Sequence, residues 1–203
     1  MTSENTQQSV IPAVIPIDIA HGYRVWYSTR LGGYSHAQYG YANMSSRQND
    51  DPDAVLRNRQ ALYDVVGAPV RTIHQVHSGE VVLADEVDND EELNELQADG
   101  LVSTRGDMLG VFGADCLPVL LVDPVHHVHA AAHCGRVGLM NDIVGQTVAA
   151  MEFKGPTALR FELRWDHAFA HNAMKWVLLL PWNLKSVFRE LQQLHALAVL
   201  VLI

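Results

Sequence analysis

The stretch GVFGADCLPVLLVDPVHHVHAAAHCG, residues 110–135, decides the fold because two apolar runs follow each other closely within it. The first run, PVLLVD, is apolar almost throughout and is typical of a β-strand that is buried on both faces. The second run, HVHAAAH, is predicted to be another short strand, and a backbone-permissive glycine follows close behind it. Cys116 and His133, whose side chains can bind a metal, stand at the ends of these two strands.

Outside this stretch the sequence predicts further short strands and two helices. The clearer helix begins after Asp51, where a capping carboxylate, Pro52 and Asp53 agree, and it ends at Gly67. An apolar stripe predicts a second helix over residues 138–153. This mixture indicates a mixed-sheet α+β or α/β domain. Strands are predicted at residues 24–30, 71–77, 80–84, 100–104 and 108–113, a lead-in arm at 1–20, and a solvated loop or short helix at 87–95.

Composition limits the class of protein. The chain has 203 residues, of which 48% are hydrophobic, and a net charge of −9, so it is neither disordered nor marked by a chain-wide basic surface for nucleic acid. Its two cysteines cannot form a disulfide-dense scaffold. The first residues lack the pattern of a signal peptide, and the apolar residues 194–203 are too short to cross a bilayer. We therefore expect a cytoplasmic protein with a small-molecule partner, no nucleic acid and no membrane.

Three segments carry metal-binding side chains at the ends of apolar strands, namely QVH, ADC and AAH. Two imidazoles and a thiolate, from His77, Cys116 and His133, are good zinc ligands, and three protein ligands leave a fourth position for water or substrate. Their wide spacing forms no local motif. The alternative for each histidine is a hydrogen-bonded structural role, and the alternative for Cys116 is a small buried hydrophobic side chain.

A second group of histidines competes with this set. Alternation along HHVHAAAH places His127, His129 and His133 on one face of a strand, where they could bind a metal adventitiously. Surface exposure is the alternative for His127 and its neighbour His126. Cys134 points to the opposite face of an ideal strand, so we interpret it as a packing residue.

Several motifs in order resemble one family. They are STRLGGYS, the Asn43 region, DDPDAVLRNRQAL, HQVHSGEVV, ADGLVSTRGDMLGVFGADCLPVLLVDP and AAAHCGRVGL, and they cover roughly residues 14–152. This pattern is similar to the bacterial polyphenol oxidases with a laccase domain, also described as zinc-dependent purine nucleoside phosphorylases. The resemblance implies a single layered α+β domain with mixed β-sheets flanked by helices. It also implies that His77, Cys116 and His133 bind zinc.

The resemblance further implies phosphorolysis of purine nucleosides, with adenosine deamination as a possible second activity. A copper-dependent polyphenol oxidase is one alternative, and a truncated, metal-binding but non-catalytic family member is another. Asp115 is the candidate for proton transfer and Arg136 for catalysis, while Arg30 and Asn43 are candidates for binding phosphate and nucleoside. The alternatives are loop orientation for Asp115, a surface role for Arg30 and turn stabilisation for Asn43.

The sequence departs from the family in two places. Residues 133–138 read HCGRVG where the family commonly has HAGWRG, so Arg136 occupies the tryptophan position. Nothing after Gly155 resembles the family's glycine-rich continuation, and residues 156–203 contain no glycine. We therefore expect a family-like metal-binding core at 1–155 and an atypical tail at 156–203, divergent or frame-shifted, that is not an independent domain.

Overall fold

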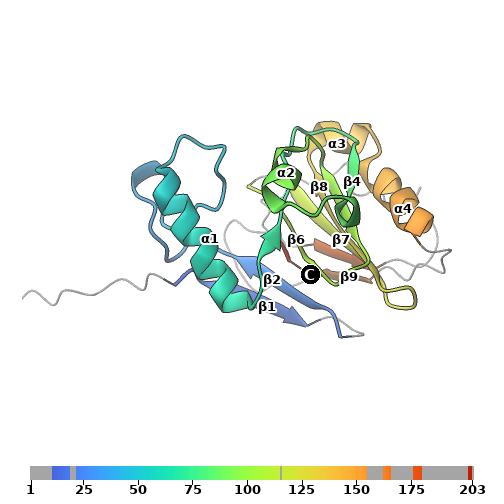
Figure 1. Ribbon diagram of the computed structural model, residues 1–203, viewed down its shortest axis with the longest axis horizontal. Coiled ribbons are helices and arrows are strands. Elements are labelled where there is room, and N and C mark those ends of the chain that lie inside the picture. Colours follow the sequence, from blue (N-terminus) through green and yellow to red (C-terminus); the bar gives the residue numbers. More distant parts are fainter. Residues whose placement is uncertain are drawn as a thin grey trace, which may run out of the picture.

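A computed structural model describes residues 11–18, 22–114 and 116–154, and it gives the backbone of three further strands up to residue 202 (Figure 1). The helices are α1 (Pro52–Val66), α2 (Asp90–Glu95), α3 (Arg136–Met140) and α4 (Ile143–Lys154), with single 3-10 turns η1 (Ala37–Tyr39) and η2 (Ala84–Glu86). The strands are β1 (Val14–Asp18), β2 (Arg24–Ser28), β3 (Val70–Arg71), β4 (Val81–Leu83), β5 (Gly100–Ser103), β6 (Met108–Val111), β7 (Leu117–Asp123), β8 (Val128–Cys134), β9 (Glu162–Trp165), β10 (Trp176–Leu179) and β11 (Val201–Leu202).

The strands form two mixed sheets and one two-stranded ribbon. The first sheet has the order β1-β2-β11-β6-β3, the second has the order β4-β5-β8-β7, and β9 pairs with β10. Each of the two larger sheets contains one parallel pair, β3 with β6 and β4 with β5, among antiparallel neighbours. The two apolar runs of the opening stretch become the antiparallel pair β7 and β8, as their composition predicts.

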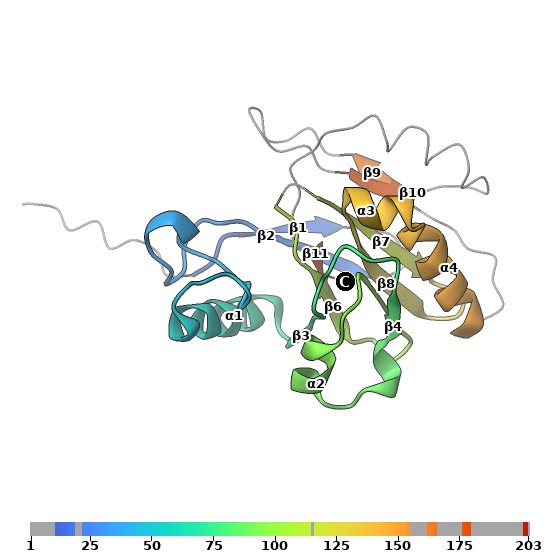
Figure 2. The same cartoon turned by 90° about the horizontal axis from the view of Figure 1, so that it is seen from above.

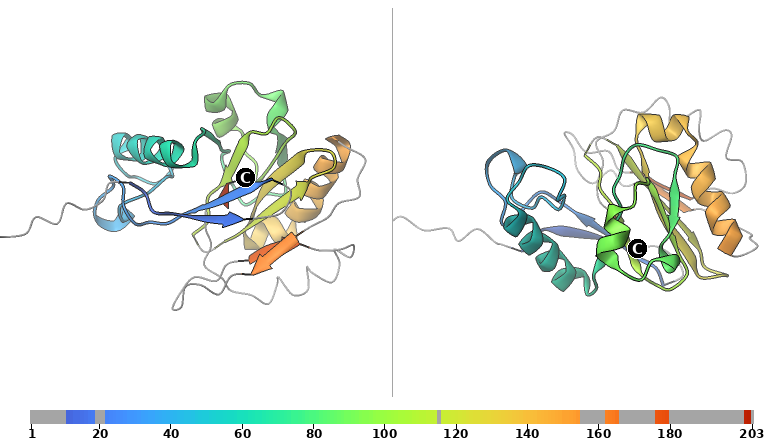
Figure 3. Two further views of the ribbon diagram at one scale, coloured as in Figure 1. Left: turned by 90° about the horizontal axis from the view of Figure 1, so that it is seen from below. Right: turned by 45° about the horizontal axis from the view of Figure 1, so that its top comes forward.

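Period-two alternation along the strands sorts their side chains into layers. In β2, Val25 faces the core between the two large sheets, whereas Trp26 packs on the side of α1. In β7, Leu120 faces that same central core, whereas Leu121 packs with the residues of α4. Helices α1 and α4 therefore cover opposite sides of the paired sheets (Figures 2 and 3). This arrangement confirms the predicted α+β class with mixed sheets flanked by helices.

Helix α1 forms where the sequence predicts it and for the predicted reasons. The Asp51 carboxylate accepts a hydrogen bond from the backbone N–H of Asp53, and Pro52 occupies the first turn. At the other end Gly67 takes a left-handed conformation, with φ at 87°, and closes the helix. The buried face of α1 includes Leu62 and Val66. Capping and burial together fix this helix beside the five-stranded sheet.

Two sequence predictions near the N-terminal half are wrong. Residues 14–18 belong to strand β1, rather than to a lead-in arm, because Pro16 is tolerated on the edge strand of a sheet. The strand predicted at residues 71–77 ends at Arg71, and a loop carries the chain onward from there. From this loop the Gln75 side chain satisfies the backbone of Phe112, because it donates to the Phe112 carbonyl and accepts from the Phe112 N–H.

The helix predicted over residues 138–153 is two helices in the structure. Helix α3 ends at Met140, and Asp142 then adopts a left-handed conformation with φ at 57°, which no continuous helix allows. Helix α4 starts at Ile143 and buries Val144, Val148 and Met151 against the four-stranded sheet. Met140, which also belongs to the predicted stripe, is 69% exposed at the end of α3. Periodicity predicts the buried face of α4, but it does not report a single residue that changes the direction of the chain.

Arg71 is a buried connector and gives a first prediction. Its guanidinium lies 2.6 Å from Asp90 and 2.9 Å from Asp107, and it also bonds the carbonyls of Ala84 and Val87. We expect Arg71→Met to lower the free energy of unfolding by about 2–4 kcal/mol. Hydrogen bonds to charged groups contribute about 1.5–3 kcal/mol each, and the loss is limited because water can still solvate the Asp90 carboxylate. Urea unfolding followed by circular dichroism measures this change.

The control for this prediction is Arg105→Met. Arg105 bonds Asp88, a side chain that is 91% exposed, so its loss should leave the unfolding midpoint almost unchanged. Equal effects of the two substitutions would contradict the connector role of Arg71.

Two further observations concern membrane-spanning helices and the C-terminal residues. Within the described ranges, no helix is both long and apolar enough to span a membrane. Most of residues 156–203 lies outside the described residues, and only the backbones of β9, β10 and β11 are given there. The predicted division into a core at 1–155 and an atypical tail therefore stays a prediction.

Candidate metal centre

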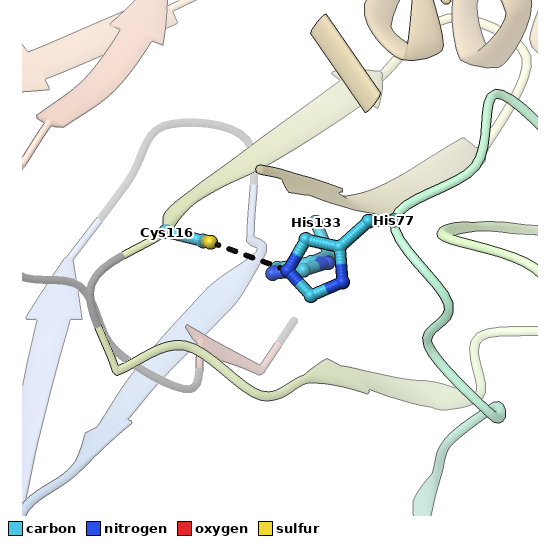
Figure 4. Close-up of side chains that lie close together, drawn as sticks. All are labelled: His77, Cys116 and His133. Carbon is cyan, nitrogen blue, oxygen red and sulfur yellow. Dashed lines mark hydrogen bonds between the residues drawn. The ribbon is translucent and has the colours of Figure 1, made fainter. Parts of the chain in front are cut away.

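Three side chains that are far apart in the sequence meet at one edge of the four-stranded sheet. One nitrogen or sulfur atom from each of His77, Cys116 and His133 lies within 4.8 Å of the others. The Cys116 sulfur is 3.7 Å from His77 Nε2, and the two imidazole rings meet edge to face with centroids 4.8 Å apart. Figure 4 shows the Cys116 sulfur pointing toward the two rings. We call these residues the metal-ligand cluster.

The pairing of β7 with β8 brings two of these side chains together. Pro118 lies opposite His133 and Leu117 lies opposite Cys134, so Cys116 enters β7 beside the point where β8 ends. His133 is on the same face of β8 as Ala131, which packs in the central core. The cluster therefore lies at the end of the interface between the two large sheets.

His77 reaches the cluster from the loop that follows β3. Its backbone is left-handed, with φ at 61°, a conformation that costs energy for a residue with a side chain. Neighbouring bonds hold the loop in place, since the His74 N–H bonds the Leu96 carbonyl and the Ala98 N–H bonds the His74 carbonyl. Strain that is kept by surrounding structure is common at functional sites.

A buried carboxylate supports the cluster from behind. Asp99 precedes β5, is 0% exposed, and accepts a 2.7 Å hydrogen bond from Nδ1 of His133. It also accepts bonds from the Ser78 N–H, the Ser78 hydroxyl and the Val76 N–H. Burial alone would raise the pKa of Asp99, but the bonds from His133, Ser78 and Val76 outweigh it and lower the pKa to about 2. Asp99 is thus an anion at neutral pH.

Gly135 has no side chain, and the metal-ligand cluster occupies the space that a side chain would fill. A Cβ atom at this position would lie 2.5 Å from Cδ2 of His77 and 3.2 Å from the Cys116 sulfur. The backbone of Gly135, with φ at −71°, is open to any residue. The glycine is therefore required by the neighbouring side chains and not by its own conformation.

The donor set and its spacing fit a divalent metal ion. Zinc bonds of about 2.0–2.1 Å to nitrogen and about 2.3 Å to sulfur place tetrahedral ligands about 3.6 Å apart. The 3.7 Å between His77 Nε2 and Cys116 Sγ agrees with that separation. His133 is buried, Cys116 is half-buried and His77 is exposed, so the cluster opens on one side. Three donors with an open side are the pattern of a catalytic rather than a closed structural site.

The other predicted site residues are Asp115, Arg136, Arg30 and Asn43. Asp115 lies outside the described residues. Arg136 begins α3 as an exposed side chain that contacts Met140. Arg30 and Asn43 are part of the segment 29–51 between β2 and α1. This segment lies at the end of the molecule away from the four-stranded sheet (Figures 1 and 2). Their assignment to catalysis and to substrate binding stays a prediction.

Two of these side chains have structural contacts of their own. The Asn43 amide donates to the Ser45 carbonyl and to Asp50, and its oxygen accepts from the Ser45 N–H, which is the turn-stabilising alternative. The Arg30 guanidinium lies against Gly40, where a Cβ atom would come within 2.7 Å of it.

The competing histidines are separated from the cluster. His129 is buried and its Nε2 lies 2.7 Å from the Asp107 carbonyl, so it has the structural role that a core histidine usually has. His126 bonds Asp123 in the turn between β7 and β8, and His127 is exposed there. Cys134 packs with α4, which confirms its interpretation as a packing residue, and burial raises the pKa of its thiol.

Sequence reasoning missed Asp99 and Ser78. It noted Gly135 as a backbone-permissive residue, whereas the structure requires this glycine for the space beside His77 and Cys116. Asp99 stands in the motif ADG directly before an apolar strand, and Gly135 follows the histidine and cysteine that end β8. A carboxylate before a buried strand is a usable signal for a group that orients a histidine. Its partner cannot be read from the sequence, because His133 is 34 positions away.

Comparisons with known proteins find several relatives of this chain. A family model described as multi-copper polyphenol oxidoreductase laccase matches residues 24–160. A protein of Corynebacterium glutamicum named purine nucleoside phosphorylase is 43% identical over 133 residues, which are 64% of this chain and 54% of that protein. One of Streptomyces coelicolor with the same name is 37% identical over 150 residues, which are 72% of this chain and 62% of that protein.

A solved structure shares the fold. The crystal structure of a Neisseria meningitidis protein superimposes with a TM-score of 0.61 at 36% identity, covering 68% of this chain and 57% of that one. The chain thus spans little more than half the length of these relatives.

Proposed function

The chain belongs to the family described as multi-copper polyphenol oxidoreductase laccase, and on that premise we propose that it is a metal-dependent purine nucleoside phosphorylase. The names of the relatives from Corynebacterium glutamicum and Streptomyces coelicolor support the reaction. The observation that carries the proposal is the convergence of His77, Cys116 and His133 within 4.8 Å at an open edge of the sheet. We further propose that the enzyme acts in the cytoplasm on small molecules.

The reaction transfers a ribosyl group to phosphate. An oxygen of inorganic phosphate forms a bond to C1′ of the ribose while the bond from C1′ to N9 of the purine breaks. The purine keeps the electron pair and takes up a proton, which gives the free base and ribose 1-phosphate. His77, Cys116 and His133 would hold a divalent ion, which would supply Lewis-acid polarisation of a substrate oxygen. Arginine suits phosphate binding because it offers paired donors, and Arg136 and Arg30 stay the candidates in this chain.

We propose zinc as the ion. Two imidazoles and one thiolate within 4.8 Å of one another suit zinc, and the exposed side of the cluster would admit a substrate. Copper binds the same donor types, and the family description names copper, so a copper-dependent phenol oxidase is the second candidate. Oxygen reduction by several electrons usually draws on more than one copper, whereas this cluster offers one site in the described part of the chain.

Phosphate dependence tests the proposal directly. The full chain, loaded with zinc, is incubated with inosine or adenosine, and the products are separated by chromatography. We expect free base and ribose 1-phosphate only when phosphate is present, and neither product after a chelator removes the metal.

The other outcomes overturn the proposal in distinct ways. Inosine formed from adenosine without phosphate would make the protein a deaminase. Phenol oxidation that requires copper and His77, without nucleoside cleavage, would make it an oxidase. Bound zinc with no turnover of any nucleoside would show a metal-binding but non-catalytic family member.

A further inference from the structure

One carboxylate connects two of the three ligand-bearing segments. Oδ1 of Asp99 accepts from Nδ1 of His133, which lies on β8, at 2.7 Å. Oδ2 accepts from the N–H of Ser78 at 2.6 Å and from its hydroxyl at 2.9 Å. It also accepts from the N–H of Val76 at 3.2 Å. One carboxylate oxygen therefore binds the strand that carries His133, and the other binds the loop that carries His77.

The bonds to Oδ2 come from the two residues that flank His77 in the sequence. Val76 precedes His77 and Ser78 follows it, so both flanking N–H groups converge on the same oxygen. Convergence of these amides requires the intervening residue to turn sharply, and His77 has a left-handed φ of 61°. Asp99 thus stabilises the strained conformation that aims the His77 ring at the cluster.

The bond to Oδ1 decides which nitrogen of His133 carries the proton. Oδ2 of the same carboxylate accepts from two backbone N–H groups and a hydroxyl, so Asp99 acts as an acceptor. The 2.7 Å contact with Oδ1 therefore points to a proton on Nδ1 of His133. Nε2 then keeps its lone pair and is the nitrogen left for a metal. His133 is 4% exposed, so the protein holds its ring in place.

We propose that Asp99 is a positioning residue, which sets the His133 tautomer and the His77 backbone together and so presents two of the three donors in binding geometry. This inference rests on the proposed metal role of the cluster, but its structural part applies to the metal-free protein as well. Asp99 would thus hold the loop of His77 and the strand of His133 in place relative to each other before a metal binds.

Asp99→Asn tests this assignment because it keeps the shape and changes the donors. Asparagine has one acceptor oxygen and one NH2 group. Three donors face Oδ2, so the amide oxygen should stay there and the NH2 group should face His133. His133 then has to accept at Nδ1 and carry its proton on Nε2, where it blocks metal binding. We expect the zinc affinity to fall by about 10- to 100-fold, the usual effect of losing such a partner.

The tautomer is read without any metal. Long-range 1H–15N correlation spectra of the metal-free full chain, labelled on histidine nitrogen, distinguish a proton on Nδ1 from one on Nε2. The His133 signal is identified by its loss in His133→Asn. We expect the Nδ1–H form in the native chain and the Nε2–H form in Asp99→Asn. A native chain with the Nε2–H form would overturn the inference even if the variant failed to fold.

Asp123→Asn is the matched control. Asp123 is 1% exposed, accepts from Nδ1 of His126 at 2.7 Å and accepts from the N–H groups of Val125 and His126. It lies at the far end of β7 from Cys116, so this variant loses similar bonds away from the cluster. We expect zinc affinity and the His133 tautomer to match the native chain.

The possible failures are distinguishable. A native chain that binds neither zinc nor copper would refute the proposed function, while the tautomer spectra would still decide the role of Asp99. Equal zinc affinity and an unchanged tautomer in Asp99→Asn would refute the positioning role and leave the proposed function intact. A similar loss of affinity in Asp123→Asn would show a general loss of stability, and it would also refute the positioning role.

Discussion

Replacing His77 with glycine should abolish tight metal binding and with it the phosphorolysis of nucleosides. The substitution removes one of three donors, and glycine accepts the left-handed backbone at this position without strain. We expect zinc affinity to fall by more than about 100-fold, beyond the range caused by losing a supporting partner of a ligand. Equilibrium dialysis with metal analysis should give about one zinc per native chain and almost none for the variant.

His127→Gly is the matched control for this substitution. His127 is also a histidine in the left-handed region, with φ at 56°, but it lies exposed in the turn between β7 and β8. Both variants relieve similar backbone strain, so a difference between them reports the ligand alone. Full zinc occupancy in His77→Gly would remove the cluster as the metal site, and equal losses in both variants would point to adventitious binding by several histidines.

Gly135→Ala should disable the same site through a single methyl group. The added Cβ would lie 2.5 Å from Cδ2 of His77 and 3.2 Å from its Nε2, so the ring has to shift from the position that it occupies in the cluster. Alanine fits the backbone, whose φ is −71°, and the strands beneath keep their pairing. We expect near-native circular dichroism and a fall in zinc affinity of about 10- to 100-fold, because ligand geometry tolerates errors of only about 0.5 Å.

Gly145→Ala provides the comparison. Its added Cβ would meet the carboxylate of Asp142, an exposed side chain that can rotate away, and alanine favours the helix. This variant should bind zinc like the native chain. Normal zinc binding by Gly135→Ala would mean that the His77 ring does not have to occupy the position found here.

The parts of the fold that the sequence predicts are those with local causes. Strand β7 follows from a continuous apolar run, and α1 follows from its capping residues and its terminal glycine. The three members of the cluster could be proposed because each stands beside an apolar segment and has metal-binding chemistry. Their convergence could not be derived from spacing, and the family resemblance was what joined them.

The parts that sequence reasoning missed depend on partners far along the chain. The segment 71–77 is predicted as a strand, but most of it is a loop whose Gln75 side chain bonds the backbone of Phe112, 37 positions away. Asp99 bonds groups that are 21, 23 and 34 positions away. No local pattern records such pairings, because the intervening strands have to fold before the groups meet.

The distances along the chain between His77, Cys116 and His133 have a thermodynamic consequence. An ion bound by all three would cross-link a loop, a strand entrance and a strand end, and the unfolded chain offers no such arrangement. Occupancy and folding are then linked by mass action, and free ion at 100 times its dissociation constant would add about 2.7 kcal/mol of stability. Chelation would consequently lower the melting temperature of the protein. A shortage of the ion in a cell would lower the activity of the protein and also shorten its lifetime.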